Sequence, residues 1–278
     1  MEKILLVINA HKPNLKSIDF ACNIAALAHT NLRGLFIENL YFDYIPMAEA
    51  EYPSYFEIVK EKAGARVTAD TEQAITIFKD ECKRKGITAK TCIDKGEPIQ
   101  ETILESRFAD LLIVDPAIGF YDREEQLPSH FVKELLAKAE CPVFLTPEEF
   151  EYADEIVFCY DGSASAVFAI KQFTYLLPEF RNKKVMLLEV NKSGDEEFDE
   201  GHRRVMDLLR AHYPSVCYHA LKGNAKDELF TYFFMKSKKI IVLGAYGRSL
   251  LSNFFKKSKA DMLLRTVDLP LFIAHNKS

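Results

Sequence analysis

The residues best suited to bind a ligand form a glycine-containing loop near the C-terminus. The stretch Gly244-Ala245-Tyr246-Gly247-Arg248-Ser249 follows directly after the apolar run Ile240–Leu243. That run has the length and composition of a strand buried on both faces. The carboxyl end of such a strand faces the ligand crevice of an open parallel sheet, where glycines let backbone N–H groups approach an anion. We therefore expect a ligand site at Gly244, Gly247 and Arg248.

A second group of residues indicates that the ligand is an anion. Ser258 opens the segment Ser258-Lys259-Ala260-Asp261, and its Ser-x-x-Asp pattern is close to a capping box, which predicts a helix N-terminus. A helix N-terminus beside a glycine-containing loop binds anions, and residues 244–265 carry a net charge of +4. The same residues also fit a turn followed by a solvated basic helix, and the sequence leaves both interpretations open.

The tripeptide Asp161-Gly162-Ser163 supplies a further polar group at the end of a strand. It follows the apolar run Ile156–Cys159, so we expect it at the same carboxyl edge of a parallel sheet. The carboxylate of Asp161 could accept hydrogen bonds from an exocyclic amine or a ribose hydroxyl. The alternative is that Asp161 and Ser163 only cap the next helix, a common role of both residue types.

Well-defined nucleotide-binding and catalytic motifs are absent from the sequence. It contains no G-x-x-x-x-G-K-[ST] phosphate loop, no G-x-G-x-x-G after a strand, no G-x-S-x-G and no H-E-x-x-H. The seven histidines form no tight cluster, and the six cysteines lack the spacing of a zinc site. We therefore expect a binding module and no catalytic residues or metal site, and we expect the thiols to be buried.

The elements that must position these residues repeat along the whole chain. Amphipathic patterns such as Ser17–Ala28 separate the apolar runs, and strand–helix alternation predicts crossover units with a parallel sheet. We expect an α/β protein with two doubly wound domains, each a five-stranded parallel sheet. The expected strands are Ile4–Ile8, Leu32–Ile37, Thr88–Ile93, Leu111–Val114 and Val143–Leu145, then Ile156–Cys159, Val185–Val190, Val216–Leu221, Ile240–Leu243 and Leu271–Ala274.

The two halves of the chain also repeat one another. An offset of 128 residues superposes Leu112-Ile113-Val114 on Ile240-Ile241-Val242, and an offset of 152 superposes Ile4–Asn9 on Ile156–Asp161. The difference places an insertion in the first half, around residues 41–68, followed by a helical pattern that reaches Lys85. We expect a first domain over residues 1–147 and a second over residues 152–278.

Composition narrows the class of protein. The chain has 278 residues, of which 48% are hydrophobic and 28% charged, and a net charge of −5. An acidic chain is a poor partner for nucleic acid, and no apolar run approaches the ~20 residues that span a bilayer. The N-terminus enters the first strand directly after Lys3. We expect a cytoplasmic protein without nucleic-acid or membrane partners.

Taken together, these motifs resemble the universal stress protein (UspA) family. The resemblance rests on strand-Asp-Gly-Ser at the start of the second half and on Gly-x-x-Gly with a serine eleven residues later, and it covers nearly the whole chain twice. It implies a tandem arrangement that imitates a family dimer, a possibility of further homodimers, and the strand order 3-2-1-4-5 in each half.

The resemblance also assigns roles to residues of the second half. Asp161 matches the adenine-side aspartate, Gly244 and Gly247 match the glycines of the phosphate loop, and Ser258 matches its terminal serine. The resemblance implies a site for ATP, ADP or AMP, with Mg²⁺ bound only together with the nucleotide. Gly162, Ser163 and Arg248 belong to the same candidate site. Lys257 stands where the pattern has glycine, and its side chain either narrows the loop or meets a phosphate as a point charge.

The first half departs much further from the pattern. Asn9 replaces the aspartate, Pro116 replaces the first glycine, Gly119 remains, and Ser129-His130 stands at the terminal positions. Its loop over residues 115–130 has a net charge of −3, which would repel a polyphosphate. We expect a degenerate first copy. Two alternatives stay open: slow ATP hydrolysis at the second site, or a stress protein that binds no nucleotide and acts through its surface and residues 41–85.

Overall fold

The computed structural model describes residues 1–38, 69–120, 125–191, 199–244 and 268–275. The insertion expected around 41–68 lies outside these ranges, as do Gly247, Arg248, Lys257 and Ser258. The chain divides into two compact units. The N-terminal unit comprises residues 2–125 and 129–140, and the C-terminal unit comprises residues 141–278 with 126–128. The domain limits expected at 147 and 152 stay a prediction.

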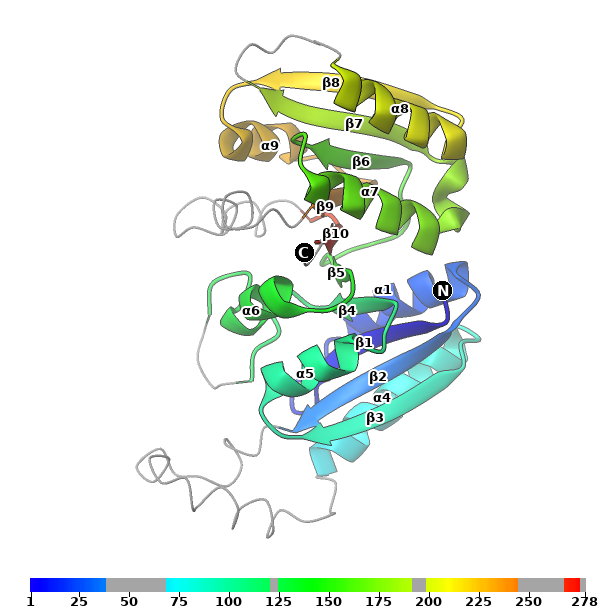
Figure 1. The fold of residues 1–278 in the computed structure, drawn as a ribbon. Coiled ribbons are helices and arrows are strands. Elements are labelled where there is room, and N and C mark those ends of the chain that lie inside the picture. Colours follow the sequence, from blue (N-terminus) through cyan, green and yellow to red (C-terminus); the bar gives the residue numbers. More distant parts are fainter. Residues whose placement is uncertain (39–68, 121–124, 192–198, 245–267, 276–278) are drawn as a thin grey trace. The chain divides into compact units, whose positions relative to one another are not determined.

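The N-terminal unit is a parallel sheet covered on both faces by helices (Figure 1). Helices α1 and α4 lie on one face, and α5 and α6 lie on the other. The strands are β1 (Lys3–Asn9), β2 (Asn31–Glu38), β3 (Ala89–Lys95) and β4 (Leu111–Val114), and the helices are α1 (Leu15–Leu27), α4 (Ala69–Arg84), α5 (Pro98–Ser106) and α6 (His130–Lys138).

The C-terminal unit repeats this plan around a second set of parallel strands. Its strands are β5 (Val143–Leu145), β6 (Glu155–Tyr160), β7 (Lys184–Asn191), β8 (Val216–Lys222), β9 (Lys239–Gly244) and β10 (Leu271–Ala274). Its helices are α7 (Ala164–Leu176), the short 3₁₀ helix η1 (Pro178–Asn182), α8 (Glu200–His212) and α9 (Ala225–Phe233).

The strand order confirms the expected α/β fold class. The hydrogen-bonded order is β3-β2-β1-β4-β5-β10-β9-β6-β7-β8, which contains the order 3-2-1-4-5 twice. All ten expected strands are present. Crossover connections between parallel strands produce this order, because a helix must return the chain to the amino end of the next strand.

One feature of the sheet differs from the expectation of two separate parallel sheets. Strands β5 and β10 pair antiparallel, with Phe144 opposite Phe272, so the sheet of the C-terminal unit is mixed. Both strands are short and fully buried, and an unpaired edge there would leave buried backbone groups without partners. Pairing with each other satisfies them. The expectation that all strands pair parallel was therefore wrong on this point.

Burial explains why these sequences form these elements. Ile4 to Ile8 of β1 are at most 3% exposed, as a central strand covered on both faces requires. The outermost strands β3 and β8 are half-exposed and include charged residues such as Lys90, Asp94 and Lys222, and charges on an edge strand protect it from further pairing. Across the described ranges, every helix is too short or too polar to cross a membrane.

Candidate functional site

The carboxyl ends of three strands meet at one edge of the C-terminal unit. The register places Cys159 of β6 between Leu188 of β7 and Leu243 of β9, so β6, β7 and β9 end at nearly the same level. Asp161 follows β6 directly, and Gly244 closes β9. Two of the segments singled out in the sequence therefore lie side by side at the expected edge.

The residues after β6 form the N-terminus of helix α7. Ser163 is its N-cap residue, and its Oγ accepts a hydrogen bond of 3.1 Å from the backbone N–H of Ala166. The Asp161 Oδ1 atom accepts one of 3.0 Å from the N–H of Ser163. Gly162 between them has φ +76°, a conformation that favours glycine. Ser163 therefore has the structural capping role that the sequence left open.

Only one of the two carboxylate oxygens of Asp161 takes part in this turn. Its Oδ2 atom accepts no hydrogen bond from the described residues, and the residue is exposed to solvent. A carboxylate oxygen at the mouth of a crevice can accept a hydrogen bond from a ligand donor.

Gly244 lies directly against the first turn of α7. A Cβ atom at this position would lie 2.5 Å from the Ala166 nitrogen and 2.6 Å from the Ser165 carbonyl carbon. Both are backbone atoms, so no side chain can be accommodated without moving the strand or the helix. The glycine predicted for contact with an anion therefore has a second role, which is to let the helix N-terminus approach the end of β9.

A cavity of about 140 Å³ opens at this edge. Most of its lining is aliphatic, and Asp161 lies at its border. Burial, followed by the charge of Asp161, raises the pKa of the Cys159 thiol, which keeps that sulfur neutral. The lining residues are Cys159, Tyr160, Asp161, Ala166, Leu188, Val190, Ala225, Leu229, Leu243 and Gly244.

The size of this cavity limits what it can hold. Pockets that enclose a whole drug-sized ligand measure roughly 300–1,000 Å³, so the described residues provide room for one ring system and not for a complete nucleotide. An apolar slot with one carboxylate at its border suits a flat heterocycle with an exocyclic amine.

At the equivalent edge of the N-terminal unit, the described polar side chains are bonded within the unit. Asn9 stands at the position of Asp161, and its Nδ2 donates a hydrogen bond of 2.6 Å to the carbonyl oxygen of Gly119. Its Oδ1 accepts one of 2.9 Å from the N–H of His11. The Asn9 amide is therefore engaged at both ends within its own unit.

The helix N-terminus in the N-terminal unit also has an internal partner. Ser129 caps α6 by accepting a hydrogen bond of 3.2 Å from the N–H of Val132, and its own N–H donates to the carbonyl oxygen of Pro116 at 3.0 Å. The carboxylate of Glu125 accepts a hydrogen bond from the N–H of His130 at the first turn. A carboxylate at this place has the charge that a helix N-terminus favours, so the unit supplies its own anion there.

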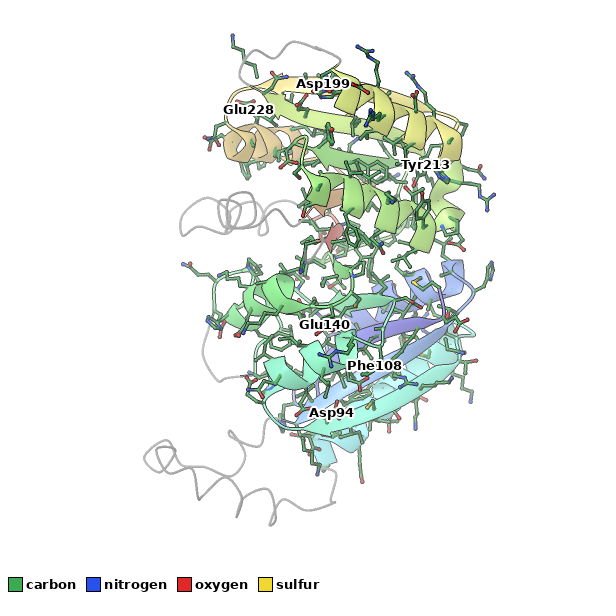
Figure 2. All side chains as sticks on the ribbon, in the orientation of Figure 1. Asp94, Phe108, Glu140, Asp199, Tyr213 and Glu228 are labelled. Carbon is green, nitrogen blue, oxygen red and sulfur yellow. The ribbon has the colours of Figure 1, made fainter. Side chains whose placement is uncertain are left out.

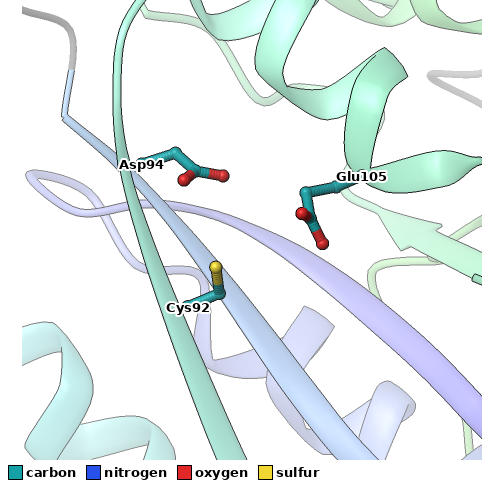
Figure 3. Close-up of side chains that lie close together, drawn as sticks. All are labelled: Cys92, Asp94 and Glu105. Atoms are coloured by element: carbon teal, nitrogen blue, oxygen red, sulfur yellow. The ribbon is translucent and has the colours of Figure 1, made fainter. Parts of the chain in front are cut away.

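Sequence reasoning missed two polar clusters. In the first, Cys92 and Asp94 of β3 and Glu105 of α5 bring a thiol and two carboxylates within 4.8 Å of one another (Figure 3). Burial, then Glu101 and Glu105, raises the pKa of Asp94, and Lys3 forms an ion pair of 3.3 Å with Glu105. The i, i+2 spacing of Cys92 and Asp94 on a strand puts them on one face, but nothing in the sequence places Glu105 beside them.

The second cluster surrounds His202 in α8. The imidazole Nδ1 lies 2.8 Å from Asp199 Oδ1, at the N-terminus of the same helix (Figure 2), and Nε2 lies 3.0 Å from Glu189 Oε2. Glu189 also accepts a hydrogen bond from the Tyr218 hydroxyl. Burial disfavours the charged imidazolium, but the two carboxylates outweigh it and raise the pKa of His202.

Comparison with solved structures identifies the family of folds to which this chain is similar. No family model and no curated protein matches the sequence. Among solved structures, a universal stress protein from Archaeoglobus fulgidus DSM 4304 is 17% identical, with a TM-score of 0.66, over 99% of this chain and 96% of that one. A protein from Pseudomonas aeruginosa UCBPP-PA14 assigned to the universal stress proteins is 15% identical, with a TM-score of 0.58, over 98% and 92%.

Matches to single-domain proteins cover about half of the chain. One from Arabidopsis thaliana, described with AMP bound, is 15% identical over 51% of this chain and 89% of that one. Its TM-score of 0.33 supports no inference about a ligand of this chain. The two full-length matches, by contrast, superpose on nearly the whole chain with TM-scores above 0.5. The chain therefore has the tandem fold of the universal stress proteins.

Proposed function

We propose that this chain is a universal stress protein that binds an adenine nucleotide at the carboxyl edge of its C-terminal unit. The observation that carries the proposal is the meeting of the aliphatic cavity, the Asp161 carboxylate and the Gly244–α7 contact at one place. Open α/β sheets bind ligands at the carboxyl ends of their strands.

The cavity is suited to the base of the nucleotide. Leu188, Leu229 and Leu243 are at most 5% exposed and present apolar surface on which a flat ring can be buried. Asp161 Oδ2 then accepts a hydrogen bond from the exocyclic amine or a ribose hydroxyl. A hydrogen bond to a charged group contributes about 1.5–3 kcal/mol, which is enough to select adenine over a ring without that donor.

The phosphates are assigned to residues that the sequence points to. Gly247, Arg248, Lys257 and Ser258 lie outside the described ranges, and their role rests on the loop pattern and on the +4 charge of residues 244–265. In this proposal Mg²⁺ binds only together with the nucleotide, and the protein acts as a binding module.

The N-terminal unit is not proposed as a second site. The Asn9 amide is engaged with Gly119 and His11, and the Glu125 carboxylate lies at the first turn of α6. A nucleotide would have to displace this carboxylate or place its phosphate beside a like charge. The side chains of the N-terminal unit therefore favour its nucleotide-free state.

Mass spectrometry of small molecules released from the purified chain by denaturation tests the proposal. We expect ATP, ADP or AMP at no more than one equivalent per chain. We also expect a higher melting temperature when adenine nucleotide is added to the emptied protein, and no such rise for Asp161→Ala. Asn9→Ala, at the matching position of the other unit, is the control and should behave like the wild type.

Other results would redirect the assignment. A chain that carries no nucleotide and shows no thermal shift with ATP, ADP or AMP would contradict the proposal and favour a protein that acts through its surface. Steady release of phosphate from ATP, lost in Asp161→Ala, would show a slow hydrolase at the same site.

A further inference from the structure

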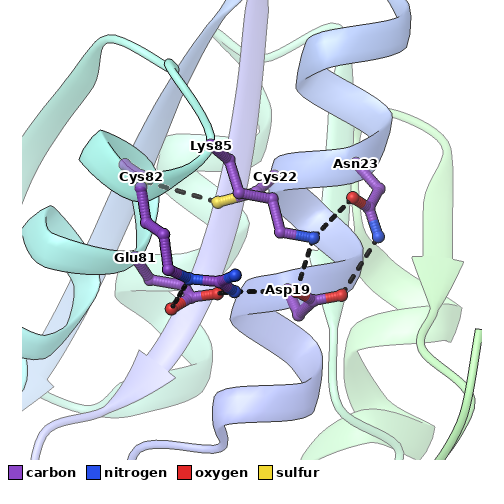
Figure 4. A network of polar contacts seen from close by, with 7 residues as sticks. Asp19, Cys22, Asn23, Glu81, Cys82 and Lys85 are labelled. Carbon is purple, nitrogen blue, oxygen red and sulfur yellow. Dashed lines mark hydrogen bonds and ion pairs between the residues drawn. The ribbon is translucent and has the colours of Figure 1, made fainter.

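Two cysteines from distant parts of the sequence meet in the core of the N-terminal unit. Cys22 in α1 and Cys82 in α4 are 60 residues apart, and their Sγ atoms are 3.6 Å apart (Figure 4). Both residues are 0% exposed. The two helices lie on the same face of the sheet, so their packing holds the sulfur atoms together.

The distance between the sulfur atoms is short enough for a covalent bond after a small adjustment. A disulfide has an S–S length of 2.03–2.05 Å, so the two atoms must approach by about 1.5 Å. Rotation about the Cα–Cβ bonds and a slight shift of one helix can supply this movement. The structure therefore holds a dithiol close to the geometry of a disulfide.

A hydrogen bond links the two sulfur atoms, and either thiol can donate it. Burial raises the pKa of both thiols. When one of them loses its proton, the S–H of the other can donate to the resulting thiolate, which is the reactive form.

The buried pair lies beside a polar network of α1 and α4 (Figure 4). Cys82 precedes the end of α4 by two residues, and the adjoining rim is polar (Figure 4). Lys85 Nζ lies 2.5 Å from Asp19 Oδ1 and 2.7 Å from Asn23 Oδ1, and the Arg84 side chain is 63% exposed. Ion pairs at such a surface are weak, so local opening of this rim gives a small oxidant a route to the sulfur atoms.

We propose that Cys22 and Cys82 form a redox-active dithiol that a peroxide converts into an intramolecular disulfide. The thiolate of one cysteine attacks one oxygen of hydrogen peroxide, the O–O bond breaks, and with one proton a sulfenic acid and one water are produced. The other cysteine then attacks the sulfenic sulfur, the S–O bond breaks, and a second water leaves with the second thiol proton. Two electrons pass from the two sulfur atoms to the peroxide, and an external dithiol reverses the reaction.

Peptide mapping of the full chain tests this assignment. The reduced protein is treated with hydrogen peroxide, denatured, alkylated and digested. We expect one linked peptide pair that contains Cys22 and Cys82, and its loss after treatment with dithiothreitol. Cys92→Ala is the matched control, because Cys92 lies beside Asp94 and Glu105 and not beside a thiol, and it should leave the linked pair unchanged.

Two further samples make the result decisive. Cys82→Ala should abolish the link and leave Cys22 free for alkylation, while oxidation of wild-type chain in denaturant should lose the preference for this pair. Recovery of alkylated Cys22 and Cys82 from the native wild type, at peroxide levels that oxidise the exposed Cys217, would overturn the proposal. This wild-type measurement is decisive even if the alanine variant does not fold.

Discussion

Asp161 is the residue on which the ligand assignment depends most directly. One carboxylate oxygen orders the turn before α7, while the other accepts no hydrogen bond within the described part of the chain. We expect Asp161→Ala to weaken the binding of ATP and AMP by about 10- to 150-fold, the loss of one hydrogen bond to a charged group. Isothermal titration measures this, and the affinity for inorganic phosphate should not change. Equal weakening of phosphate would place the anion, and not the base, at Asp161.

His202 makes the stability of the C-terminal unit depend on pH. Glu189, Asp199, Tyr218 and Tyr160 surround its ring, and the carboxylates raise its pKa in the folded state. Its stabilising effect is therefore complete below the ordinary histidine pKa of about 6.5 and is lost as the pH rises through the higher folded value. We expect the free energy of unfolding to fall over this window.

Urea denaturation at several pH values checks that expectation. The wild type should lose stability as the pH rises from about 6 to 8, and His202→Gln should remove most of that slope because glutamine does not titrate. His212→Gln is the control, since His212 lies in the same helix and packs edge-to-face against Tyr175. An unchanged slope in His202→Gln would assign the pH dependence to another group.

At the scale of the elements, Gly244 was predicted as a site residue, but the sequence did not show that it also packs against a helix. The sequence indicated a glycine that approaches an anion, whereas the structure shows one that approaches the backbone of α7. We expect Gly244→Ala to lower the free energy of unfolding by at least about 1–3 kcal/mol, the cost of overpacking. Gly119→Ala should change it by no more than about 0.5 kcal/mol, since no atom lies within 4 Å of a Cβ there. Chemical denaturation of both variants measures the difference, and equal effects would contradict the packing argument.

A disulfide between α1 and α4 has its own consequence for stability. It closes a loop of 60 residues, and restriction of the unfolded chain by such a loop is worth about 4 kcal/mol. We expect peroxide treatment to raise the melting temperature of the N-terminal unit and dithiothreitol to reverse the rise. A lower melting temperature for the linked protein would mean that closing the bond strains the helices more than it restricts the unfolded chain.

At the scale of the whole molecule, periodicity and repetition predicted the strands and their α/β arrangement. Runs such as Leu111–Val114 are apolar throughout and are fully buried. The antiparallel pairing of β5 with β10 could not be predicted, because strands of three and four residues carry too few side chains to specify their partner or direction.

The candidate site was predictable only in part. Motif positions identified Asp161 and Gly244, since both follow strands that the pattern locates. The aliphatic lining from α9 and the Glu125 carboxylate at α6 depend on how loops return to the sheet. No local spacing reports that path, so the sequence indicated a degenerate N-terminal unit only through Asn9, Pro116 and the loop charge.

The central claim is that one unit of the tandem binds nucleotide and the other does not. Isothermal titration of ATP into the emptied full-length chain tests it most directly, with Asp161→Ala and Asn9→Ala as paired variants. The account predicts one site per chain, weakened by Asp161→Ala and unaffected by Asn9→Ala. Two equivalent sites per chain, or one site that responds to Asn9→Ala and not to Asp161→Ala, would contradict it.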